Sequence, residues 1–210
     1  GFNENSKTYE NPRDGYWVVS ITRTFQPGQW TTFCSPVNLT ESQLKQLFGD
    51  DVQVAELKAQ NTNELQFVTS HSLKAGVPCI IKVMKPTENN EYLLEDNFTF
   101  ASQAETVNVN GGAFYGTLSV TTANGGYSLN PNTSAVEQIK DSYELPAMSA
   151  YYVTLLDVII DGTTGIGTIT TTTPEGDIYT IGGQKVGSGE KAAKRLQRGV
   201  YVVGGKKHAK

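Results

Sequence analysis

Hydrophobic and polar residues alternate in short runs along most of the chain. Residues 16–23, YWVVSITR, place Trp17, Val19 and Ile21 on one side of an extended segment and the intervening residues on the other. A repeat of two is the period of a β-strand, whose successive side chains point to opposite faces of a sheet. The pattern therefore predicts a half-buried strand, followed by a Pro-Gly turn at 27–28.

Further strands are expected wherever this pattern recurs between turn signals. The segments are rich in Val, Ile, Thr and aromatic residues, as strands usually are. They cover residues 29–37, 52–58, 64–69, 77–84, 97–101, 105–109, 113–120 and 127–129. The aromatic-rich segment 145–160, LPAMSAYYVTLLDVII, is expected to close the main part of the protein as one long strand or two.

One helix is expected, over residues 41–48. Thr40 suits the N-cap, Gln43 completes a capping box at the third helical position, and Gly49 suits the end of the helix. The apolar stripe of this helix consists of Leu44, Leu47 and Phe48. A helix of eight residues is too short to be stable alone, so it must pack against a sheet.

These elements predict an all-β protein whose main domain, residues 1–160, is an antiparallel β-sandwich with one short helix. The polar stretch KPTENNEY leaves open a division of this domain into two lobes near 85–96. Residues 161–176 are rich in Thr and predict a linker that is stiff enough to lie extended against a sheet edge. Residues 177–210 contain two hairpin patterns around Gly-Gly turns, which predict a small C-terminal β-hairpin module.

Charge distinguishes the C-terminal module from the rest of the chain. The formal net charge is −4, but residues 178–210 carry eight Lys or Arg against Glu190 alone, which leaves −11 on the other residues. These opposite charges favour either attraction between the two parts or simple solubility. The acidic total gives no reason to expect nucleic acid, and no apolar run approaches the roughly 20 residues of a membrane-spanning segment.

Three sets of motifs stand out along the chain. The first comprises GQWTTFCSPV at 28–37, TESQLKQLFG at 40–49 and LKAGVPCIIK at 73–82, and the second comprises FYGT at 114–117 and LPAMSAYY at 145–152. The third comprises DGTTGI at 161–166, IYTIGGQKV at 178–186 and GVYVVGGKK at 199–207. Together they resemble the motifs of a group of secreted and surface proteins of Bacteroides-type bacteria. Two positions depart from that pattern, since Cys79 stands in place of an aromatic residue and Val37 in place of a phenylalanine.

The resemblance implies that the tail is a C-terminal sorting or attachment module of an exported protein, with export or sorting machinery as its partner. The residues that would serve this role are Tyr179, Gly183, Gly199, Tyr201, Gly204, Lys206 and Lys207. It also implies a secreted or outer-surface location with the signal peptide removed, which fits a sequence that begins Gly1-Phe2. The alternative is a plain hairpin that completes the sandwich.

The sequence offers little for catalysis. Its two histidines, His71 and His208, lie far apart, and Cys34 would need His71 as a base to act as a nucleophile. An apolar strand such as the one around Cys34 raises the pKa of a thiol and opposes that role. We also find no phosphate-binding, dinucleotide-binding or hydrolase motif, so we expect no catalytic residue, cofactor or metal site. An enzyme whose cleft is assembled from distant residues remains the competing hypothesis.

The two cysteines leave two states open. A disulfide between Cys34 and Cys79 would close a long loop and stabilise the protein by about 4 kcal/mol, and export would favour it. Two free thiols in the core are equally compatible with the sequence.

Aromatic residues are the remaining candidates for a binding site. A sugar-stacking surface could consist of Tyr127, Tyr143, Tyr151, Tyr152 and Trp30, although such residues more often pack in a core. With the resemblance, this favours a non-enzymatic exported surface protein of the adhesion or binding type, whose partner is a glycan or a host matrix protein. The alternatives are a carbohydrate-binding accessory module of a polysaccharide-utilisation system and a structural spacer without a ligand.

Overall fold

The computed structural model describes most of the chain. The described residues are 1–60, 64–109, 112–123, 125–154, 156–166, 177–180, 184–188, 200–203 and 206–209. The chain divides into two compact units, Gly1–Ile169 and Thr170–Lys210. Both are built from β-strands, and the described residues form one helix, α1 (Glu41–Phe48). No helix in this part of the chain is long and apolar enough to cross a membrane.

A six-stranded sheet forms the centre of the first unit. Its strands, in spatial order, are β16 (Thr163–Ile166), β15 (Asp157–Ile160), β5 (Glu64–Ser70), β4 (Gln53–Gln60), β6 (Pro78–Lys82) and β3 (Trp30–Cys34). All neighbours are antiparallel except β15 and β5, which are parallel. Because β3 ends this order, one of its sides is free of sheet partners.

Three smaller sheets surround the central one. A five-stranded sheet has the order β12 (Val136–Gln138), β11 (Tyr127–Leu129), β14 (Ser149–Tyr152), β9 (Gly112–Thr117) and β8 (Thr106–Val109). A three-stranded sheet has the order β1 (Phe2–Asn3), β2 (Gly15–Thr22) and β7 (Glu91–Phe98). A two-stranded ribbon pairs β10 (Thr121–Thr122) with β13 (Glu144–Leu145).

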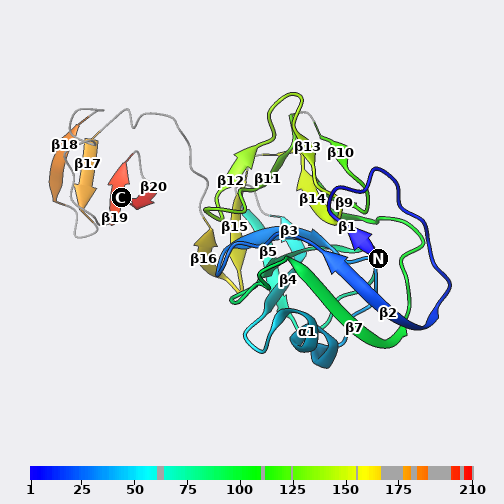
Figure 1. The fold of residues 1–210 in the computed structure, drawn as a ribbon. Coiled ribbons are helices and arrows are strands. Elements are labelled where there is room, and N and C mark those ends of the chain that lie inside the picture. The colour runs from blue at the N-terminus through cyan, green and yellow to red at the C-terminus, as the bar shows by residue number, and fades with distance from the viewer. Residues whose placement is uncertain are drawn as a thin grey trace. The chain divides into compact units, whose positions relative to one another are not determined.

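The central sheet is buried on both faces, which gives a sandwich-like arrangement. In β6, Cys79 and Ile81 enter one apolar cluster, while Ile80 between them enters another. The first cluster joins the central sheet to α1 and the β2–β7 pair, and the second joins it to the five-stranded sheet. Figure 1 shows α1, β2 and β7 on one side of β3, β4 and β5, and strands β9 to β14 on the other. The all-β sandwich expected from the sequence is confirmed.

Aromatic rings fill the first face. Phe48 lies at the end of α1, and its ring centroid is 5.0 Å from that of Tyr92, 5.6 Å from that of Phe25 and 6.0 Å from that of Phe33. The helix is held there as its sequence predicts, with Thr40 at the N-cap in a capping box and Gly49 at the C-cap. The tilted and edge-on arrangement of these rings is the one that aromatic side chains prefer.

The second face combines apolar packing with hydrogen bonds along the edge strand β3. Phe67 and Phe114 meet edge to face, with centroids 5.6 Å apart. Next to them, the free side of β3 hydrogen-bonds to neighbouring segments: the Trp30 amide donates to Ser134 Oγ (2.8 Å) and the Cys34 amide to Met148 O (3.3 Å). These bonds satisfy peptide groups that an edge strand would otherwise leave unpaired.

Two expectations about individual strands are wrong. Of the segment predicted as a strand over 97–101, residues 97 and 98 are the end of β7, which begins at Glu91 and pairs with the whole of β2, and Phe100 forms only an isolated bridge with Val37. Its alternation is hard to see in the sequence because Leu93 is exposed on the outward face, while Asp96 occupies a position in phase with buried Tyr92 and Phe98. Segment 145–160 spans parts of three strands rather than one or two, interrupted by a proline at 146 and a positive φ of 58° at Met148. In addition, the sequence analysis did not predict the short strands β1, β10 and β12.

The second unit contains a four-stranded antiparallel sheet. Its order is β18 (Lys185–Ser188), β17 (Asp177–Thr180), β19 (Val200–Val203) and β20 (Lys206–Ala209). The two expected hairpins are β17–β18 and β19–β20, and pairing of β17 with β19 joins them. Of the predicted linker, residues 163–166 form β16 at the edge of the central sheet, and 167–176 lie outside the described residues.

Candidate binding pocket

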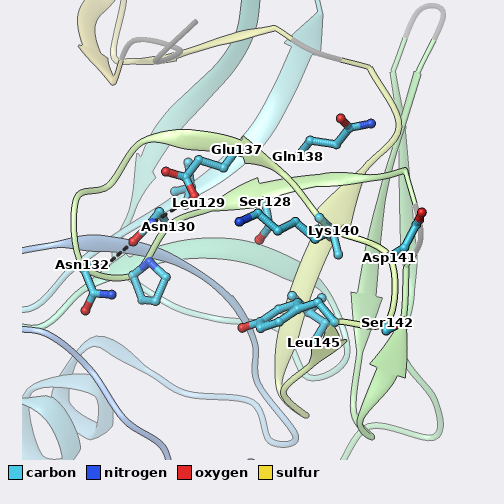
Figure 2. Close-up of a pocket in the computed structure, with 13 residues that line it drawn as sticks. Ser128, Leu129, Asn130, Asn132, Glu137, Gln138, Lys140, Asp141, Ser142 and Leu145 are labelled. Carbon is cyan, nitrogen blue, oxygen red and sulfur yellow. Dashed lines mark hydrogen bonds between the residues drawn. The ribbon is translucent and has the colours of Figure 1, made fainter. Parts of the chain in front are cut away.

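A pocket of about 540 Å³ lies beside β11 and β12 of the five-stranded sheet. Two segments form it: residues 128–132, which run from β11 into the following turn, and residues 137–145, which run from β12 to β13. Figure 2 shows these two segments facing each other, with the Lys140 side chain extending between them toward the strand of Ser128. This volume is within the range of small-molecule sites. We call this hollow the Tyr143 pocket, after its most exposed aromatic residue.

Tight turns fix the shape of this pocket. The Asn130 amide donates to Ala135 O (2.7 Å), and the Asn130 side chain accepts a bond from the Asn132 amide (2.8 Å). Ser134 completes the turn with a positive φ of 60°. Asn and Ser suit these positions because their short side chains hydrogen-bond to nearby backbone and tolerate unusual dihedrals. The sequence NPNTSA therefore places a rigid turn at one wall of the pocket.

The lining combines one exposed aromatic ring with many hydrogen-bonding groups. Tyr143 has 49% of its surface exposed, and apolar contact surface comes also from Leu129 and Leu145. The polar lining consists of Ser128, Asn130, Asn132, Glu137, Gln138, Lys140, Asp141 and Ser142. One pair is already fixed, since Asn130 Nδ2 donates to Glu137 Oε2 at 3.0 Å. Such a mixture of an aromatic face with neutral and charged hydrogen-bonding groups suits a ligand rich in hydroxyl groups.

A second hollow of about 200 Å³, the Arg23 chamber, adjoins the first. The residues that line both are Ser128, Leu129, Pro131, Asn132, Tyr143 and Leu145. The chamber also contains Arg23, which is only 5% exposed. Its Nη1 donates to Glu4 Oε2 and its Nη2 to Ser149 Oγ, each at 3.0 Å. Burial lowers the pKa of the guanidinium, and the Glu4 carboxylate opposes that shift, so Arg23 stays a paired cation.

The structure separates the five predicted stacking residues. Tyr143 alone lines the pocket. Tyr152 is a core residue, 3% exposed, whose hydroxyl donates to Leu156 O at 3.3 Å, and burial raises its pKa. Tyr127 lies opposite it in the sheet and stacks on its ring, with centroids 6.1 Å apart.

The other two predicted aromatics also have intramolecular partners. Tyr151 points away from the core face of β14 and stacks on Tyr115 at 5.1 Å, with ring planes 18° apart. Trp30 is half-buried, and the ammonium group of Lys82 lies 5.1 Å from its ring centre. Ring faces that are covered in this way have less area for a ligand, so the five residues do not form one stacking surface.

Both cysteines are free thiols, so the disulfide hypothesis fails. In the β3–β6 register, Phe33 lies opposite Cys79 and Cys34 lies opposite Pro78. Directly opposed residues share a face of a sheet and successive residues alternate. The two thiols therefore point to opposite faces and cannot be bonded. Burial raises the pKa of Cys34 to about 12 and that of Cys79 well above its usual value.

Cys34 and His71 do not form a nucleophile–base pair. Cys34 is fully buried and donates its thiol proton to Gly76 O at 3.2 Å. His71 is exposed, with its Nδ1 at 3.9 Å from Glu41 Oε1. Among the residues that the structure describes, no three His, Cys, Asp or Glu side chains gather in a way that could hold a metal ion.

The residues expected to serve sorting or attachment belong to the second unit. Tyr179 lies on β17, Tyr201 on β19, and Lys206 and Lys207 on β20. The register places Tyr179 opposite Val202 and Lys207 opposite the same valine. The remaining expected residues, Gly183, Gly199 and Gly204, lie outside the described residues.

Sequence reasoning found Tyr143 but missed its surroundings. The turn residues Asn130 and Asn132 carry a local signal, since Asn-Pro and Asn-Thr-Ser are typical turn sequences. Arg23 and Glu4 carry none, because they come together only when β1 pairs in parallel with β2. Comparison of this chain with protein-family models, with curated proteins and with solved structures finds no match.

Proposed function

We propose that this chain is a non-enzymatic binding protein of the exported, surface-exposed type, and that its first unit binds a glycan. The Tyr143 pocket carries the proposal. It offers an exposed aromatic ring next to amide, hydroxyl and carboxylate groups, and its turns hold these groups in place. Pyranose rings have apolar faces and a rim of hydroxyl groups, which such a lining complements.

Tyr143→Ala tests this proposal. Purified chain is screened against an array of glycans and host matrix proteins, and the affinity for each bound glycan is then measured by calorimetry. The variant should bind at least about tenfold more weakly, since loss of a stacked ring costs on the order of 1.4 kcal/mol or more. Tyr16→Ala is the matched control, because Tyr16 is 65% exposed on β2 and lines neither hollow. Equal affinity of Tyr143→Ala and the control would contradict the assignment.

Binding without turnover distinguishes this function from that of a glycosidase. The bound glycan is incubated with the protein and its chain length is then analysed. We expect it to be recovered intact, because the nucleophile and base that the sequence allowed, Cys34 and His71, lie in different settings. Shortened products that Glu137→Gln abolishes would instead establish an enzyme.

Adhesion to a protein is a second candidate, favoured by a different surface. Tyr16, Val18 and Leu93 are 65%, 62% and 58% exposed, and the β2–β7 register puts them on one face of that pair. Contiguous exposed apolar residues often mark protein interfaces. Because Glu91 and Glu95 lie on the same face, a basic matrix protein is the partner that fits. Matrix binding that Val18→Asp abolishes and Tyr143→Ala preserves would favour this function.

We also propose that the second unit serves sorting or attachment at the cell surface. The proposal rests on the resemblance of its motifs, and it is supported by the compactness of this unit and by its excess of Lys and Arg. Deletion of residues 178–210 should abolish surface display in the native cell while the first unit still folds. Undiminished display of the shortened chain would contradict it.

A further inference from the structure

Arg23 is an unusual residue to find between the two sheets of a sandwich. A buried charge is costly unless every hydrogen-bonding group around it is satisfied. Two of its nitrogens are satisfied, by Glu4 and by Ser149, but Nε has no hydrogen-bond partner. Because Arg23 lines the chamber, this leaves one donor of a nearly fully buried side chain without an acceptor beside a hollow of about 200 Å³.

Two hydroxyl groups beside the chamber, those of Ser128 and Thr32, are by contrast already hydrogen-bonded. Ser128 Oγ donates to Ala150 O at 3.0 Å and lies 3.2 Å from Thr32 Oγ1. Thr32 Oγ1 in turn accepts a bond from the Ala150 amide at 3.1 Å. These bonds join β3 to β11 and β14, so their role is to hold the two sheets together. Among the described residues that line the chamber, Arg23 Nε is the buried side-chain polar atom without a hydrogen-bond partner.

The chamber is too small to be a ligand site by itself. Its 200 Å³ is below the roughly 300 Å³ at which small-molecule sites begin. It shares six lining residues with the Tyr143 pocket, and Tyr143 itself is one of them. A ligand ring that stacks on Tyr143 is thus placed to project a substituent toward Arg23.

Charge decides which substituent fits. The Glu4 carboxylate neutralises Arg23, and its other oxygen accepts from Thr24 Oγ1 at 2.7 Å. The charged residues that line one or the other hollow are Glu137, Lys140 and Asp141 in the pocket and Glu4 and Arg23 in the chamber, with a formal sum of −1. An incoming carboxylate would meet a compensated cation and neighbouring anions. An uncharged oxygen, such as a sugar hydroxyl, can accept from Nε without that penalty.

We propose that the Arg23 chamber is a subsite of the Tyr143 pocket that receives an uncharged oxygen of the ligand at Arg23 Nε, so that the site selects neutral over acidic sugars. The inference rests on the proposed glycan-binding function and names its ligand class. It makes Glu4 the residue that sets selectivity, because Glu4 cancels the charge that would otherwise attract an acidic sugar.

The test uses the full chain, neutral oligosaccharides of gluco-, manno- and galacto-configuration, and oligogalacturonate of matched length. Wild-type protein should bind a neutral oligosaccharide at least about tenfold more tightly than oligogalacturonate. Arg23→Lys keeps a cation for Glu4 but removes the Nε donor, and should weaken neutral binding by up to about tenfold. Glu4→Gln keeps the shape and removes the anion, and should strengthen oligogalacturonate binding severalfold.

Folding is controlled independently of binding. Thermal melting is measured for every variant, and Gln26→Trp is added because Gln26 is exposed and lines only the chamber. A large ring there should obstruct the chamber and weaken neutral binding without touching Arg23. Val68→Ala serves as the unaffected control, because Val68 is exposed and lines neither hollow.

Three results would overturn the inference. Tighter binding of oligogalacturonate by the wild type would show an anion site, although the glycan-binding function would stand. Unchanged neutral affinity in folded Arg23→Lys and Gln26→Trp would show that the chamber is not used. Absence of binding to every oligosaccharide would overturn the proposed function together with the inference.

Discussion

The two faces of the central sheet are buried in different ways. On the face toward α1, the rings of Phe25, Phe33 and Phe48 pack with Tyr92 in an apolar cluster. On the face toward the five-stranded sheet, an apolar cluster of similar composition ends at β3 in a group of buried polar residues. The first face can contribute only stability, whereas the polar end of the second face adjoins both hollows.

The difference shows where this sandwich can accommodate a site. Hydrophobic packing is non-directional, and in the aromatic core the Tyr92 hydroxyl is the one buried side-chain polar atom without a hydrogen-bond partner among the described residues. The edge strand β3 has peptide groups that need partners, and the residues that satisfy them, such as Ser134, come from the pocket-forming turn. Polar residues that the edge requires are thereby brought next to the Tyr143 pocket.

The largest effect on stability is expected from a substitution in the aromatic core on the α1 side of the central sheet. Phe48→Ala should lower the free energy of unfolding by about 3–5 kcal/mol, because it removes a 2% exposed ring that contacts three others. Urea denaturation followed by tryptophan fluorescence measures it. Glycan affinity of the folded variant should not change. A loss below about 1 kcal/mol, or a parallel loss of affinity, would contradict the separation of the two faces.

A smaller effect on stability is expected from loss of the Arg23–Glu4 ion pair. Burial opposes ionisation of Glu4, but the hydrogen bonds from Thr24 and the charge of Arg23 outweigh it and lower its pKa below the ordinary 4.5. A carboxylate with a lowered pKa in the folded state contributes stability that is fully present above its unfolded pKa. That contribution is lost as the pH falls through the folded value.

Wild type and Glu4→Gln are therefore compared by urea denaturation at several pH values. At neutral pH the wild type should be the more stable, and its advantage should shrink as the pH falls below about 4.5. A difference in stability that stays constant down to about pH 3 would show that the Glu4 carboxylate is not stabilised by its partners.

The smallest effect on stability is expected at the pocket itself. Tyr143→Ala should change the free energy of unfolding by no more than about 0.5 kcal/mol, since half of this side chain is already exposed to water. The same denaturation experiment measures it, with Tyr16→Ala beside it. Together with the affinity measurement, it distinguishes a residue kept for binding from one kept for folding. A large destabilisation would instead assign Tyr143 to the core.

Local elements were the part of the fold that could be predicted. The capping box of α1, the strand of residues 16–23 and the two C-terminal hairpins depend on interactions within a few residues, which the sequence displays directly. The strand β7 was obscured because exposed Leu93 and the acidic Asp96 break the alternation of apolar inward and polar outward positions. The parallel pairing of β15 with β5 joins segments about 90 residues apart and has no local signal.

For the candidate site, too, only features with a local signal could be predicted. Tyr143 could be named from the sequence, as one aromatic residue among five, but nothing local separated it from Tyr152, which is a core residue. The sequence alone determined an all-β chain with one capped helix, because alternation, turn residues and caps act over a few positions. Only the tertiary structure decided that Cys34 and Cys79 face opposite ways and that Arg23 meets Glu4 beside a pocket. Those outcomes depend on strand register and on contacts between distant segments, and a shift of one residue in register would reverse the face of every side chain involved.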